Sequence, residues 1–165
     1  MKAKKAKNSK KVKKITKKKK VVMVSGGFDP IHIGHIRYMK EAKKLGDKLI
    51  VVINNDNWIN LKKGKAFMPD IERKEIIEGI GCVDKVILSF HEPGTSDLSV
   101  CSEIQKIKPH IFANGGDRKP DWNPVPEVEL CNELGIKMVY NVGQGGKVRS
   151  SSDLVKEYAK HLSKK

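Results

Sequence analysis

Short apolar segments alternate with longer amphipathic segments along the chain from residue 21 onward. The apolar segments are rich in Val and Ile and show little polar alternation, which is typical of strands buried on both faces of a parallel sheet. In the amphipathic segments, apolar residues recur every three to four positions, as in helices that cover such a sheet. We predict strands at 21–25, 49–53, 86–90, 110–113 and 136–140, and helices at 33–45, 69–80, 97–107 and 126–134, followed by a last helix that reaches residue 162.

Five strand and helix units in this order predict one Rossmann-like, doubly wound α/β domain over residues 21–165, with a five-stranded parallel sheet. We expect Thr95 or Ser96 to cap the third helix, and the polar segment 54–68 to form a loop. The helix faces predicted to be buried contain Tyr38, Met39, Ala42 and Leu45, then Ile76, Ile77 and Ile80, and at the end Leu154, Val155, Tyr158, Ala159 and Leu162.

The polar connections of this domain leave the carboxyl ends of the predicted strands. Open α/β sheets bind their ligands at those ends. We therefore expect the turn at Gly26, the lysine-bearing segment 54–68, the segment 115–122 and the serines at 150–152 to face one crevice.

The charge of the chain is concentrated at its beginning. The formal net charge is +15, and residues 1–20 hold 12 of the 34 Lys and Arg residues with no Asp or Glu, so that 22 basic side chains remain against 19 acidic ones. Residues 1–20 contain too little apolar surface to offset the entropy of ordering them, and we expect a disordered basic tail. Contact with a polyanion through this tail, or a merely solvated tail, are the two interpretations.

Three cysteines, Cys82, Cys101 and Cys131, lie far apart, and none has a second Cys or a His at zinc-ligand spacing. We expect reduced cysteines in a cytoplasmic protein and no protein-bound metal. No apolar segment approaches the length of about 18 residues that predicts a membrane span.

The turn after the first strand contains several residues that could contact a ligand. Gly26 and Gly27 let the backbone approach a ligand, and His32 and His35 share one face of the following helix start. Gly34 removes a side chain that would crowd whatever the histidines bind. A helix N-terminus offers free N–H groups and the positive end of a dipole, which favour phosphate. The glycines do not follow the G-x-G-x-x-G spacing of dinucleotide sites, so hydride transfer loses its main support.

The segment GGFDPIHIGH resembles the H-x-G-H signature of the nucleotidyltransferase superfamily. Similarity to its cytidylyltransferase-like branch continues through KLGDKLIVVINND, the lysine-bearing segment, Glu72 and Arg73, VDKVI, FANGGD and the serines. The chain resembles glycerol-3-phosphate cytidylyltransferases and the adenylyltransferase module of ADP-heptose synthesis. Its ending, SSSDLVKEYAKHL, also resembles that of phosphopantetheine adenylyltransferases, which leaves the acceptor open.

The resemblance implies transfer of an AMP or CMP group from ATP or CTP, carried with Mg²⁺, to a polyol or sugar phosphate, with release of pyrophosphate. It implies catalytic roles for His32, His35 and Lys62, with Lys63 and Lys65 as alternatives to Lys62. The nucleotide-binding residues that it implies are Gly26, Gly27, Phe28, Asp29, Gly34, Arg73, Gly115, Gly116, Asp117, Ser150, Ser151 and Ser152. Within this set, residues 115–117 would hold the base and the serines would meet the phosphates.

Other interpretations of these residues remain open at this point. Arg73 is also explained by an ion pair with a glutamate on its own helix, and the serines by ordinary helix capping. The glycerol-phosphate branch has an arginine where this chain has Gly145, and Lys147 or Arg149 are the candidates to replace it. Relatives of this kind are often dimers, so a homodimer is one expectation.

The alternative function is a nucleotide- or nucleic-acid-binding protein that acts through its basic tail without catalysis. That hypothesis predicts binding that weakens steeply with salt. A fragment of an aminoacyl-tRNA synthetase shares the tetrapeptide HIGH, but the chain lacks its length and a KMSKS-like loop.

Overall fold

All five predicted strands are present in the computed structural model, which describes residues 18–116, 126–143 and 150–164. In chain order the elements are β1 (Val21–Gly26), α1 (Ile33–Lys43), β2 (Lys48–Ile53), α2 (Asp56–Lys63), α3 (Asp70–Glu78), β3 (Lys85–Leu88), α4 (Cys101–Ile107), β4 (Ile111–Gly115), α5 (Val128–Glu133), β5 (Lys137–Val142) and α6 (Ser151–Leu162). The basic tail lies outside the described residues up to residue 17, so its contact with a polyanion stays a prediction.

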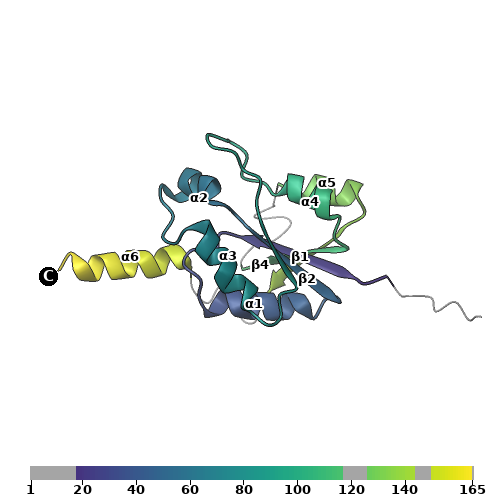
Figure 1. The fold of residues 1–165 in the computed structure, drawn as a ribbon, viewed down its shortest axis with the longest axis horizontal. Coiled ribbons are helices and arrows are strands. Elements are labelled where there is room, and N and C mark those ends of the chain that lie inside the picture. The colour runs from purple at the N-terminus through teal and green to yellow at the C-terminus, as the bar shows by residue number, and fades with distance from the viewer. Residues whose placement is uncertain (1–17, 117–125, 144–149, 165) are drawn as a thin grey trace, which may run out of the picture.

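The five strands form one parallel sheet in the order β3-β2-β1-β4-β5. From β1 the chain moves outward to β2 and β3 and then returns to place β4 on the other side of β1 (Figure 1). The strand order therefore reverses between β1 and β4, which is where doubly wound sheets bind ligands. The prediction of a Rossmann-like α/β domain with a five-stranded parallel sheet is confirmed.

Successive strand residues point to opposite faces of the sheet, and helices cover both faces. The cluster that joins the sheet to α1 and α3 includes Val22, Val24, Met39, Ala42 and Ile77. The cluster that joins it to α4 and α5 includes Met23, Phe112, Ile104 and Cys131. Ile76, which we predicted to be buried beside Ile77, is exposed. Of the helices in the described ranges, none is long and apolar enough to span a membrane.

The segment 54–68, predicted as a loop, instead begins with the helix α2. Asn55 caps this helix by accepting a hydrogen bond on Oδ1 from Trp58 N at 3.1 Å. Trp58 and Ile59 are buried. The prediction was wrong because a helix of 8 residues with two adjacent apolar side chains shows too little periodicity, and its stability comes from burying those side chains in the tertiary structure.

The helix α4 is shorter than the predicted range 97–107, and neither Thr95 nor Ser96 caps it. Asp97 N donates to Thr95 Oγ1 at 3.1 Å, and Ser99 N donates to Asp97 Oδ1 at 2.7 Å. These local bonds give the backbone an alternative to helix, which delays its start to Cys101.

The predicted burial of the α6 face is wrong. Val155, Tyr158 and Leu162 are exposed, with Tyr158 at 64%. Figure 1 shows α6, in yellow, projecting from the rest of the fold. The helix is attached at its first turn, where Ser151 Oγ donates to Pro30 O at 2.8 Å. Periodicity shows which side of a helix is apolar, but it does not show whether another segment covers that side, and none of the described residues buries it here.

A single arginine fastens the connections around the carboxyl ends of β1 and β2. Arg73 of α3 is only 1% exposed. Its Nε donates to Met68 O at 3.0 Å, and its Nη1 donates to Gly27 O at 2.6 Å and to Asn54 O at 2.8 Å. Its Nη2 forms an ion pair with Asp56 Oδ1 at 2.6 Å. The alternative of an ion pair with a glutamate of the same helix is therefore wrong.

We predict that Arg73→Met destabilises the fold by roughly 3–5 kcal/mol, because three carbonyls and one carboxylate lose their charged donor. Urea denaturation followed by circular dichroism measures this free energy. The matched control is Lys74→Met, which removes an exposed pair with Glu78 and should cost less than about 1 kcal/mol. Equal stability of the two variants would contradict the role assigned to Arg73.

Candidate functional site

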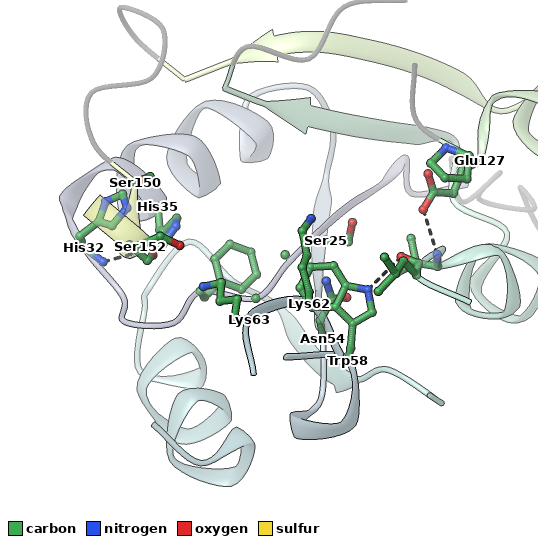
Figure 2. Close-up of a pocket in the computed structure, with 17 residues that line it drawn as sticks. Ser25, His32, His35, Asn54, Trp58, Lys62, Lys63, Glu127, Ser150 and Ser152 are labelled. Atoms are coloured by element: carbon green, nitrogen blue, oxygen red, sulfur yellow. Dashed lines mark hydrogen bonds between the residues drawn. The ribbon is translucent and has the colours of Figure 1, made fainter. Parts of the chain in front are cut away.

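A cavity of about 500 Å³ lies at the carboxyl ends of β1 and β2 and reaches the start of α6. The predicted site residues that line it are Gly26, Gly27, Phe28, His32, His35, Lys62, Ser150, Ser151 and Ser152. Figure 2 shows the histidines and serines at one end of this cavity and Glu127 at the other. The fold thus brings together residues that are more than a hundred positions apart in the sequence.

The two histidines form the N-terminal cap of α1. His32 Nδ1 accepts a hydrogen bond from Gly34 N at 3.1 Å, and His35 Nδ1 accepts one from His32 N at 3.3 Å. Their rings are stacked, with centroids 3.8 Å apart. Because each Nδ1 accepts a backbone N–H, each neutral imidazole carries its proton on Nε2. The cap therefore fixes both rings in the tautomer that has an Nε2–H donor.

The His35 imidazole is neutral at pH 7. Burial lowers its pKa from 6.5 to about 3, and the neighbouring His32 and Lys63 act in the same direction. An anion bound beside the ring would favour the charged form and raise this pKa again. The site is thus arranged so that an anionic ligand relieves an electrostatic cost.

The turn before α1 packs closely around these rings. Phe28 meets His35 edge-on, with ring centroids 5.1 Å apart. A Cβ at Gly26 would lie 2.9 Å from the Phe28 ring, and one at Gly34 would lie 2.8 Å from the His32 ring. The space left at Gly34 is therefore filled by His32 itself, whereas we expected it to accommodate the ligand.

Two lysines reach the cavity from the last turn of α2, where we expected a loop. Lys63 Nζ donates to Asp29 O at 2.9 Å, and burial lowers the pKa of Lys63, while the charge of Asp29 opposes this shift. Lys62 Nζ lies 4.6 Å from the centroid of the Trp58 ring. Both ammonium groups are held at the wall by the protein, and both favour an anion in the cavity.

A second cavity of about 650 Å³ lies between α6 and the segment that follows α2. It shares Lys62 and Lys63 with the first cavity, and Lys65 and Lys156 also line it. Four lysines make this cavity a positively charged extension of the site, which favours an anionic ligand.

The three serines at the start of α6 have different contacts. Ser150 caps the helix, with its Oγ accepting from Asp153 N at 3.0 Å. Ser151 is buried and fastens α6 to Pro30. Ser152 lines both cavities. The helix start thus faces the same space as the histidines, and its N–H groups favour an anion there.

Some predicted nucleotide-binding residues serve the framework around the cavity. The carboxylate of Asp29 accepts hydrogen bonds from Phe67 N and Met68 N, both at 2.8 Å, and Asp29 also lines the second cavity. The donors of Arg73 are engaged by Asp56 and by backbone carbonyls. Direct contact of Asp29 or Arg73 with a nucleotide stays a prediction.

The predicted base-binding segment lies beside α1. A Cβ at Gly115 would meet the Tyr38 ring at 2.8 Å, and Gly116 adopts a positive φ of 75°. Asp117 lies outside the described residues, and so do Lys147 and Arg149. The base-binding role of Gly115, Gly116 and Asp117 stays a prediction.

Sequence reasoning did not identify the end of the cavity opposite the histidines. The residues there are Ser25, Asn54, Trp58, Leu98, Val100, Pro126 and Glu127. Ser25 and Asn54 could have been found, because they end or follow predicted strands. Trp58 and Glu127 carry no local signal, since only the packing of α2 against the segment before α4 brings them to one wall.

Neither Cys101 nor Cys131 is an activated thiol, and the described residues offer no metal cluster. Burial raises the pKa of Cys131 to about 11 and also raises that of Cys101, so both thiols are protonated near neutral pH. Within the ranges that the structure covers, no group of three His, Cys, Asp or Glu side chains could hold a metal ion.

Known proteins are similar to this chain in sequence and in fold. The bifunctional protein HldE of Hydrogenovibrio crunogenus is 39% identical over 109 residues, which are 64% of this chain and 21% of that protein. FAD synthase of Pyrococcus abyssi is 38% identical over 118 residues, which are 71% of this chain and 75% of that protein. The structure of a lipopolysaccharide core biosynthesis protein from Thermoplasma volcanium superposes with a TM-score of 0.61 at 30% identity, over 76% of this chain and 98% of that one.

A family model described as cytidylyltransferase-like matches residues 23–156. The match begins within β1 and ends within α6, so it includes both histidines, the lysines of α2 and the serines. The chain spans about a fifth of HldE and three quarters of the FAD synthase. The predicted resemblance is confirmed, and the predicted enzyme class is confirmed at the level of the family. On a match over most of its length, the chain belongs to the cytidylyltransferase-like family of nucleotidyltransferases.

Proposed function

We propose that this chain transfers an AMP or CMP group from the Mg²⁺ complex of ATP or CTP to the phosphate of a small acceptor. An oxygen of the acceptor phosphate attacks the α-phosphorus of the nucleotide, the bond from that phosphorus to the bridging oxygen breaks, and pyrophosphate leaves. The observation that carries the proposal is the stacked pair His32 and His35, whose Nδ1 atoms are occupied by backbone N–H groups at the wall of a lysine-lined cavity.

Each part of the site has a role in this proposal. Phosphoryl transfer needs positioning and stabilisation of charge more than covalent help from the protein. The Nε2–H groups of His32 and His35 donate to oxygens of the α-phosphoryl group, and the ammonium groups of Lys62 and Lys63 offset its charge. The acceptor phosphate is already a nucleophile, so no general base is required.

The relatives favour an adenylyl group and a polyhydroxylated acceptor. FAD consists of AMP joined to FMN, which is a ribityl phosphate, and HldE acts in ADP-heptose synthesis, which joins AMP to a sugar phosphate. Both products contain AMP, which favours ATP over CTP for this chain. We therefore propose ATP as the donor and a polyol or sugar phosphate, FMN included, as the acceptor.

The activity test combines ATP or CTP with Mg²⁺ and, in turn, FMN, glycerol 3-phosphate or a sugar 1-phosphate, and measures release of pyrophosphate. We expect release to require one acceptor of this panel. Absence of release with every donor and acceptor pair would contradict the proposed function.

The two halves of the His35 ring can be separated by substitution. His35→Asn keeps an acceptor near the position of Nδ1 and removes the Nε2–H donor, so we expect kcat to fall by about 10²–10³-fold with little change in Tm. His35→Gln places an amide N–H near the position of Nε2 but loses the cap, so it should retain more activity and less thermal stability. Unchanged kcat in His35→Asn would refute the role of the distal donor.

The low pKa of His35 gives a testable pH dependence. Because the folded-state pKa of about 3 lies below the ordinary value of 6.5, the unfolded chain binds the proton first as the pH falls. The contribution of His35 to the free energy of unfolding is therefore fully present above about pH 6.5. It decreases toward pH 3, by at most about 1.4 kcal/mol per pH unit. In ¹H–¹⁵N spectra at pH 5, His35 should remain neutral with its proton on Nε2. A titration midpoint near 6.5 would contradict this assignment.

A further inference from the structure

The two ends of the cavity differ in chemistry. One end carries the Nε2–H donors of the histidines, the ammonium group of Lys63 and the N–H groups at the start of α6. The other end has an apolar wall made by Trp58, Leu98, Val100 and Pro126, and this wall is interrupted by Asn54 and Glu127 (Figure 2). The first end suits phosphate. The proposed phosphate chemistry does not use the second end.

Glu127 has one structural oxygen and one without a partner. Its side chain lines the cavity, and the residue is only 4% exposed. Oε1 accepts a hydrogen bond from Val100 N at 2.9 Å, which caps the start of α4. Oε2 is buried and has no hydrogen-bond partner within the part of the chain that the structure describes. A buried carboxyl oxygen without a donor costs free energy, so the cavity is incomplete without a donor from a ligand.

Asn54 presents the same deficiency on the same wall. It is 5% exposed, and its backbone is fixed because its N–H donates to Gly26 O at 2.9 Å and its carbonyl accepts from Arg73. Its Oδ1 is buried and lacks a partner among the described residues. Two unsatisfied acceptors in one cavity point to a ligand that brings hydrogen-bond donors.

Trp58 defines the shape of this end. Its indole Nε1–H donates to Leu98 O at 2.9 Å, which fixes the ring against the segment before α4. Trp58 and Val100 are buried, and Lys62 Nζ lies 4.6 Å from the centroid of the Trp58 ring. The buried carboxylate of Glu127 disfavours a second phosphate beside it. The ligand body at this end is therefore neutral, with hydroxyl or N–H groups, and a phosphate on the same molecule would extend toward the lysines and histidines.

We propose that Glu127 and Asn54 form the subsite for the non-phosphate part of the acceptor, whose hydroxyl or imide N–H groups donate to Glu127 Oε2 and Asn54 Oδ1. This inference rests on the proposed function. It narrows the acceptor to a phosphate monoester with a donor-bearing body, such as a polyol, a sugar or the ribityl and imide groups of a flavin. An amino group of the nucleotide base has the same hydrogen-bonding chemistry, but the predicted base-binding residues Gly115 and Gly116 do not line this cavity.

The decisive variant is Glu127→Gln, because a glutamine keeps an oxygen for Val100 N and replaces the second oxygen by an NH₂ group. A donor would then face the donor of the ligand. We expect KM for the acceptor that the wild type uses, FMN or glycerol 3-phosphate, to rise by about tenfold or more, while KM for ATP changes less than twofold. The matched control is Glu129→Gln on the exposed side of α5, which should change neither KM.

The outcomes separate the two sources of donors. A rise in KM for ATP with an unchanged KM for the acceptor would assign Glu127 to the nucleotide base and overturn the proposal. Unchanged values for both substrates would overturn it as well. If Glu127→Gln lowers Tm relative to Glu129→Gln, the wild type itself is tested with analogues.

Those analogues are propyl phosphate against glycerol 3-phosphate and N3-methyl-FMN against FMN, compared by calorimetric binding to the wild type. For the acceptor that binds, we compare its affinity with that of its analogue. An affinity about tenfold or more lower for the analogue supports the subsite, and equal affinities overturn it.

Binding also distinguishes failure of this inference from failure of the proposed function. If no acceptor releases pyrophosphate, the proposed function fails. Calorimetric binding of FMN or glycerol 3-phosphate that weakens in Glu127→Gln would still support the subsite, and absence of binding by both would overturn it.

Discussion

The buried guanidinium of Arg73 is the interaction on which the geometry of the site depends. Parallel strands leave backbone carbonyls at their carboxyl ends, and a buried carbonyl needs a donor. Arg73 donates to the carbonyls of Gly27, Asn54 and Met68 and pairs with Asp56. It thereby fixes three parts of the site: the turn at Gly27 that leads to the histidines, the backbone of Asn54 in the cavity wall, and the connection between α2 and α3 at Met68. These hydrogen bonds of the guanidinium all go to the framework around the cavity.

The histidines combine a structural and a chemical role in one ring. The Nδ1 atoms of His32 and His35 satisfy backbone N–H groups at the start of α1, which a serine or aspartate would do in an ordinary helix. An imidazole has a second nitrogen, and the cap leaves that nitrogen with the proton. Glu127 follows the same principle, because one carboxyl oxygen accepts from Val100 N before α4 and the other has no hydrogen-bond partner among the residues that the structure describes. In both cases the fold determines the position and hydrogen-bonding role of the atom that remains.

The family match identifies a class of proteins and does not identify an acceptor. The similar proteins bear different names, FAD synthase and bifunctional protein HldE. Substrate choice depends on individual contacts in the site and not on the shared fold. The wall around Glu127 and Trp58 is acidic and aromatic, and its contacts do not suit a phosphate. It is therefore the part of the cavity where the choice of substrate could be made.

The sequence by itself determined the five strands, the parallel sheet and the end of the cavity that the histidines line, because buried strands are uniformly apolar and the histidines and glycines of residues 26–35 lie close together in the chain. Only the tertiary structure decided that α2 is a helix, that α6 leaves its apolar side exposed, and that Glu127 and Asn54 line the same cavity. The physical reason is the range of the interactions. Periodicity reports which side of a segment is apolar, whereas burial and unsatisfied hydrogen bonds depend on what another segment, distant in sequence, places beside it.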